Sequence, residues 1–230
     1  MVSSASQVAD YLLTLVRTDK NVEKKHHGIS VFFVPAKQKG ITITPLTKLG
    51  MRAIGSCTVN FEDVFVPDDL VLGEPGKAWY TLLPTLNNER IMVGAQCLGA
   101  IDGVLEDAIE YAKQRTAFGK PIGSFQAIQH YIADIAMWQL EVELMLRHAA
   151  SLQAAGKPCG LEANMLKMMA TERAVKAADL GIQILGGMGY SAETDMQRYW
   201  RDHRILRMTP ISNEMVRNTI AESLGLPRSF

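Results

Sequence analysis

The sequence predicts an α+β fold in which a partial antiparallel β-domain is followed by an antiparallel bundle of four to five helices. Up to about residue 70, short runs of β-branched and aromatic residues end at Gly, Pro, Asp or Lys, as strands do. From Gly76 onward the apolar spacing becomes helical. A chain of 230 residues that is 47% hydrophobic can form a sizeable core. We therefore expect two domains, at residues 1–72 and 73–230.

The β-part is predicted from runs that either alternate or are rich in β-branched and aromatic residues. The four expected strands are residues 11–16, 29–34, 41–44 and 57–62. Between the first two, the stretch 24–27 (Lys-Lys-His-His) is expected to be an exposed hairpin loop. A metal role for its histidines is disfavoured because no third ligand stands at metal spacing. With no preceding partner strand, the sheet is expected to have an open edge, covered by another chain or by an earlier segment of a longer protein.

Apolar residues at alternating spacings of three and four predict the helices. The three long apolar stripes span residues 98–112, 128–152 and 165–185. Gly and Pro residues separate them, and Gly186-Gly187 ends the third. A fourth helix is expected to begin at a capping box formed by Thr194 and Gln197 and to end before Pro210, and a fifth to span about 212–224.

The composition excludes several classes of protein. The 24 basic and 24 acidic residues cancel, so a nucleic-acid binder is not expected. Cys57, Cys97 and Cys159 are widely spaced and read as reduced thiols, with neither a disulfide frame nor a metal site. No secretory signal and no apolar run of about 18 residues are visible. We expect no membrane association and a location in the cytoplasm or the mitochondrial matrix.

Two segments have a pattern that fits either ligand binding or a simple turn. In RTAFGKPIGSFQAIQ, Arg115 and a helix N-terminus near Ser124 are suited to an anion such as a pyrophosphate, but an exposed Arg in an interhelical turn explains them equally well. In QILGGMGY, three glycines allow close approach of the backbone to a ligand, or serve only to turn the chain.

A third segment, LNNERIMVG, places Glu89 and Arg90 in what we expect to be the N-terminal region of a helix. A carboxylate there is either favoured by the helix dipole or acts as a general base in an apolar pocket. From the residues alone, the structural role is the simpler one.

Together these segments resemble the acyl-CoA dehydrogenases over nearly the whole chain. Residues 48–79 (KLGMRAIGSCTVNFEDVFVPDDLVLGEPGKAW) are similar to the second half of that family's middle β-domain. RTAFGKPIGSFQ, GIQILGGMGY and YWRDHRIL are similar to motifs of its C-terminal helical domain. The family's N-terminal helical domain and first β-strands have no counterpart, so the chain resembles the C-terminal portion of such a protein.

The resemblance implies a flavoprotein that uses FAD to oxidise an acyl-CoA thioester to the trans-2-enoyl-CoA. A carboxylate removes the α-proton while the β-hydrogen leaves as hydride to the flavin. It also implies a homotetramer or dimer of dimers, and an electron-transferring flavoprotein as electron acceptor. The implied FAD contacts are Ser3, Arg115, Phe118, Gln126, Gln183, Gly186, Gly187, Ser212 and Glu214, several of them to the flavin of a neighbouring subunit. Arg90 is implied to meet the CoA nucleotide.

The chain departs from the family at the catalytic base. Most relatives carry a Glu in the motif I-Y-E-G-T, but here Thr209, Pro210, Ile211 and Ser212 stand at the Tyr-Glu-Gly-Thr positions. In a minority of relatives the base instead precedes an Arg on an earlier helix, where this chain has Glu89. We expect Glu89 to be the catalytic base, with Glu214 as second choice. The alternative is an inert subunit that shares a flavin site with an active partner.

Overall fold

The computed structural model describes residues 2–228, and its first part forms two small antiparallel sheets. One sheet has the strand order β1-β5-β4 and the other β2-β3-β6. The strands are β1 (Val2–Ser4), β2 (Tyr11–Arg17), β3 (Ile29–Pro35), β4 (Ile41–Leu46), β5 (Ser56–Phe61) and β6 (Val71–Leu72). The four expected strands are therefore confirmed. The two added strands contain only two or three residues, too few for a periodic pattern.

A shared core joins the two sheets. Leu12 of β2 and Val34 of β3 are paired in register, and both lie in one apolar cluster with Val59 of β5. The expected hairpin also forms, because β2 and β3 pair antiparallel from Tyr11 opposite Pro35 to Arg17 opposite Ile29. The loop between these strands contains the stretch 24–27.

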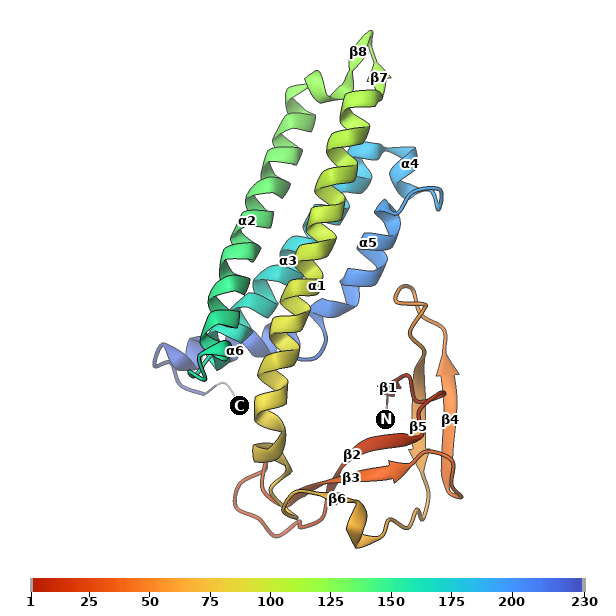
Figure 1. The fold of residues 1–230 in the computed structure, drawn as a ribbon, viewed down its shortest axis with the longest axis vertical. Helices are drawn as coiled ribbons and strands as arrows, with labels where there is room; N and C mark the ends of the chain where they lie inside the picture. The colour runs from red at the N-terminus through yellow and green to blue at the C-terminus, as the bar shows by residue number, and fades with distance from the viewer. Residues whose placement is uncertain (1, 229–230) are drawn as a thin grey trace. The chain divides into compact units, whose positions relative to one another are not determined.

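Helices dominate from Ala78 onward (Figure 1). The long helices are α1 (Ala78–Gln114), α2 (Gln126–Ala154) and α3 (Gly160–Leu185); the shorter ones are α4 (Gly187–Tyr190), α5 (Met196–His203) and α6 (Asn213–Ser223). A small hairpin of β7 (Thr116–Ala117) and β8 (Lys120–Pro121) and a 3-10 turn (Ile122–Ser124) join α1 to α2. Two further 3-10 turns span Asp68–Leu70 and Arg204–Arg207. Figure 1 shows the β7–β8 hairpin at one end of the bundle and α6 at the other.

The bundle core consists of the predicted apolar stripes. Ile101 of α1, Ile135 of α2 and Leu166 of α3 have no exposed surface and belong to one cluster. Helices α1 and α3 lie very close at Gly94, where a Cβ would come within 2.7 Å of the Leu166 side chain. The chain divides into two compact units, residues 1–86 and 87–230. Within the described residues, no helix combines the length and apolar character that crossing a membrane requires.

The prediction that Thr194 and Gln197 form a capping box at the start of the fourth helix was wrong. Helix α5 begins at Met196, its N-cap position is Asp195, and no side chain caps it. The Thr194 hydroxyl instead donates to the Met188 carbonyl oxygen at 2.7 Å. The α-helix also ends at His203, well before Pro210, and the 3-10 turn at Arg204–Arg207 follows it directly. The fifth helix does begin as expected, because Ser212 caps α6 by accepting a hydrogen bond from the Met215 amide.

Candidate functional site

Glu89 and Arg90 lie in the interior of α1, about three turns from its first residue. The expectation that they lie in the N-terminal region of a helix was therefore wrong, because α1 begins at Ala78, before its apolar stripe becomes regular. A helix dipole acts mainly within the first turn, so it does not explain a carboxylate at position 89. Glu89 is exposed, and it accepts no hydrogen bond from the part of the chain that the structure describes.

Arg90 points its guanidinium into a partly buried position. Its Nη1 donates to Asn87 Oδ1 at 2.9 Å, but its buried Nε has no partner among residues 2–228. Burial lowers the pKa of Arg90, and the charge of Glu89 acts in the opposite direction. A buried donor without a partner is costly, so this nitrogen is suited to an acceptor on a bound ligand.

The segment 209–214, which joins the last 3-10 turn to α6, lies against α3. Pro210 has no acid–base group, and Ser212 uses its hydroxyl to cap α6. Glu214 is exposed in the first turn of α6, where the helix dipole is enough to favour a carboxylate. Of the two candidate bases, Glu89 is thus the one without a structural explanation.

Lys167 of α3 is a functional candidate that the sequence reasoning missed. It is fully buried, and its Nζ donates to the Ile211 carbonyl oxygen and to Asn213 Oδ1. The sequence did contain one indication, because a Lys stands within the Met-rich run 165–169 of an apolar stripe. The pattern does not predict which residues it would contact.

A second group of candidates forms a cradle at the other end of α3. A cavity of about 550 Å³ is lined by residues that include Arg115, Gly186 and Gly187. Gly186 has φ +59° and ψ −133°, and a Cβ on either glycine would meet no atom within 4 Å. Arg115 is exposed and forms no ion pair among residues 2–228. An open glycine backbone beside an unpaired cation fits an anionic group such as a pyrophosphate.

The remaining candidates lie outside the lining of this cavity. Phe118 is 96% exposed at φ +54°, between β7 and β8. Gln126 is the first residue of α2, so α2 begins two residues later than expected from Ser124. Gln183 is exposed near the end of α3. Ser3 belongs to the β-unit, where it pairs with Cys57.

The two ends of α3 hold separate groups of residues. Nineteen positions separate Lys167 from Gly186, which corresponds to about 28 Å along a helix. A ligand group that is bound in the cradle therefore lies too far from Lys167 to react beside it.

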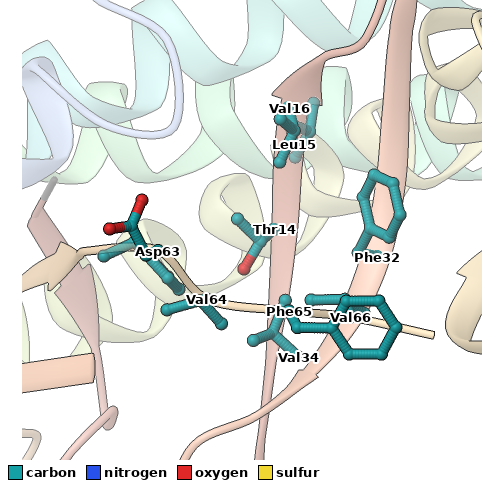
Figure 2. Close-up of a pocket in the computed structure, with 10 residues that line it drawn as sticks. Thr14, Leu15, Val16, Phe32, Val34, Asp63, Val64, Phe65 and Val66 are labelled. Carbon is teal, nitrogen blue, oxygen red and sulfur yellow. The ribbon is translucent and has the colours of Figure 1, made fainter. Parts of the chain in front are cut away.

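The β-unit contains an apolar cavity that the sequence analysis did not predict (Figure 2). Its volume is about 610 Å³, and β2, β3 and the segment 63–66 line it with Val, Leu and Phe side chains. Figure 2 shows Asp63 and Thr14 as its polar residues. The Thr14 hydroxyl already donates to the Leu12 carbonyl oxygen, so the lining offers few polar groups that could bind or activate a ligand.

No metal site is found in residues 2–228, because no group of three or more His, Cys, Asp or Glu side chains converges there. His26 and His27 each place Nε2 near the Tyr80 hydroxyl, at 3.2 and 3.3 Å.

The chain consists of a β-unit and a helical bundle that carries the glycine cradle, and each of these parts matches a known domain family. Residues 76–225 match the acyl-CoA dehydrogenase C-terminal domain, and residues 1–64 match the acyl-CoA dehydrogenase middle domain. The chain belongs to the acyl-CoA dehydrogenase family.

Individual relatives agree with this assignment. The chain is 37% identical over 217 residues to the mitochondrial short-chain specific acyl-CoA dehydrogenase of Bos taurus, covering 94% of this chain and 52% of that protein. Butyryl-CoA dehydrogenase from Megasphaera elsdenii superposes with a TM-score of 0.90 at 33% identity, covering 97% of this chain and 58% of the other. An acyl-CoA dehydrogenase from Geobacillus kaustophilus gives a TM-score of 0.94 at 32% identity, with coverages of 97% and 59%. The chain thus spans about half the length of the curated relatives it matches.

Proposed function

We propose that this chain is part of an FAD-dependent acyl-CoA dehydrogenase that converts an acyl-CoA thioester to the trans-2-enoyl-CoA, and that Glu89 is its catalytic base. The observation that carries the assignment of Glu89 is its place in the interior of α1, exposed and without a hydrogen-bond donor in residues 2–228. Family membership supports the reaction class. Pro210 at the usual position of the base supports the shift of this role to Glu89.

Proton removal from the α-carbon requires a positioned carboxylate. In the proposed reaction, Glu89 takes the α-proton on a carboxylate oxygen, and Arg90 directs its unpaired Nε to an anionic group of the CoA moiety. When bound, FAD supplies the acceptor for the hydrogen and electron pair that leave the β-carbon. Ser212 and Glu214, at the start of α6, are the contacts proposed for it in the bundle, and Ser3 is proposed separately as a contact in the β-unit.

The cradle supports a shared cofactor site. The unpaired Arg115, with the open backbone of Gly186 and Gly187, would hold the FAD pyrophosphate, with Phe118, Gln126 and Gln183 around it. Because this cradle and the region of Lys167 lie about 28 Å apart along α3, we assign the cradle to the flavin of a neighbouring subunit in a homotetramer or dimer of dimers. An electron-transferring flavoprotein would then accept the electrons.

The substitution Glu89→Gln tests this proposal. It keeps the size of the side chain but removes the basic oxygen, so the full-length protein should remain yellow while turnover falls by about 10²- to 10⁴-fold. Flavin absorbance and its bleaching by an acyl-CoA measure the two properties in one sample. Glu106→Gln, which changes another exposed carboxylate of α1, is the matched control and should bleach at a rate close to that of the wild type, and Glu214→Gln tests the second candidate base.

Wild-type turnover in Glu89→Gln together with a large loss in Glu214→Gln would transfer the role of base to Glu214. A colourless wild-type protein that gains flavin only with an active paralogue would instead identify an inert partner subunit.

A further inference from the structure

Lys167 is a charged side chain with no exposed surface, in the core of the bundle. Burying an ammonium group is costly unless each charge finds hydrogen-bonding partners. Lys167 Nζ has two, both in the segment before and at the start of α6: the Ile211 carbonyl oxygen at 2.5 Å and Asn213 Oδ1 at 2.8 Å. The lysine therefore ties α3 to this segment.

Asn213 continues the same network and is itself fully buried. Its Nδ2 donates to Thr171 Oγ1 at 3.1 Å, and Thr171 lies one helical turn after Lys167 on α3. Asn213 also lies within 3.5 Å of Glu172 Oε1. Two successive turns of α3 thus hold the 211–213 segment from one side.

Titratable groups from three helices act on Lys167 electrostatically. Arg90 and Cys97 belong to α1, Glu172 to α3 and Glu214 to α6. The pKa of Lys167 is lowered to about 8: burial and the charge of Arg90 lower it, and Cys97, Glu214 and Glu172 act to raise it. Lys167 therefore interacts electrostatically with Arg90, which follows Glu89 on α1, and with Glu214 on α6.

We propose that Lys167 is a positioning residue of the acyl-CoA site: by holding the Ile211 carbonyl and the Asn213 side chain, it fixes the 209–213 segment as a wall of that site. The inference rests on the proposed function, which places Glu89 and Arg90 in the site and assigns Ser212 and Glu214, in and beside this segment, to its flavin. Lys167 acts through Ile211 and Asn213, not through contact with substrate. It sets how well the acyl group is bound and leaves proton abstraction to Glu89.

The test compares two variants of the flavin-loaded full-length protein that each replace a cation of α3 by methionine. Lys167→Met removes both hydrogen bonds to the segment. It should raise KM for the acyl-CoA about tenfold while kcat changes less. It should also speed amide hydrogen exchange in residues 209–213. Arg173→Met is the control, because Arg173 pairs with Glu141 of α2 at 2.9 Å and does not touch this segment. It should leave KM and exchange there unchanged.

Faster exchange with an unchanged KM would overturn the inference, since Lys167 would then be a structural tie alone. The same change of KM in Arg173→Met would also overturn it, because general loosening of the bundle would explain both. If Lys167→Met does not fold, Thr171→Val removes a hydroxyl from the same network and should raise KM in the same direction by a smaller factor. A wild-type protein that oxidises no acyl-CoA refutes the proposed function, and that result is seen before any variant is compared.

Discussion

At the scale of single residues, Gly186 has a backbone conformation that other residues avoid. Its φ of +59° with ψ of −133° lies outside the regions open to a residue with a Cβ. Because a Cβ there would meet no atom within 4 Å, all strain in Gly186→Ala would come from the backbone. We expect the variant to lose about 1–3 kcal/mol of unfolding free energy, measured by denaturant titration.

Gly187→Ala is the matched control for this prediction. A Cβ at Gly187 also meets open space, but its φ lies outside the positive range and it begins the short helix α4. It should be neutral or slightly stabilising. Equal losses of unfolding free energy in the two variants would show that the backbone conformation of Gly186 is not the cause of the loss.

Residues of the candidate site differ in how well the sequence predicts them. Glu89 and Arg90 can be named from the sequence, because the Glu-Arg pair itself is similar to the pair that carries the base in some members of the family. Lys167 cannot, because its partners Ile211 and Asn213 are more than forty positions away. Burial of a lysine depends on a tertiary contact that periodicity does not encode.

At the scale of the elements, the apolar stripes located the long helices, whereas the ends of helices were less predictable. Thr194 and Gln197 have the spacing of a capping box, yet the Thr194 hydroxyl bonds to the Met188 carbonyl oxygen. A local motif cannot exclude a competing acceptor from an adjacent turn. Helix α6 begins close to the expected residue 212, and the Ser212 hydroxyl caps it by accepting from the Met215 amide at 3.3 Å.

The connection between α3 and α6 should make stability depend on pH. The pKa of Lys167 is lowered from 10.5 to about 8 in the folded protein. Between these values the unfolded chain binds a proton that the folded chain has released, so the free energy of unfolding gains a term that rises with pH. The slope of this term is at most about 1.4 kcal/mol per pH unit.

Denaturant titrations of the wild type and Lys167→Met at pH 7, 8, 9 and 10 measure this term by difference. The stability of the wild type relative to the variant should be constant up to about pH 7 and then increase with pH. A difference that stays flat through pH 10 would show that Lys167 keeps an ordinary pKa despite its burial.

At the scale of the whole molecule, the proposed function assigns the two candidate regions of the bundle to different active sites. Glu89 would serve the flavin of its own subunit, and Arg115 would hold the flavin of a neighbour. Symmetry then requires that each site of a dimer combine a base from one copy with a cradle from the other. This arrangement makes a prediction that a site contained within one subunit does not make.

Glu89→Gln and Arg115→Gln should each be inactive alone, the first for lack of a base and the second for weak flavin binding. When the two variants are coexpressed and assemble at random, half of the pairs are mixed. Each mixed pair has one site with both Glu89 and Arg115 intact, so activity should recover to about a quarter of the wild-type value. Turnover per total subunit, measured on tagged and purified mixed oligomers, checks this. If base and cradle served the same subunit's flavin, every site in a mixed pair would carry one defect, and the coexpressed protein would stay as inactive as its parents.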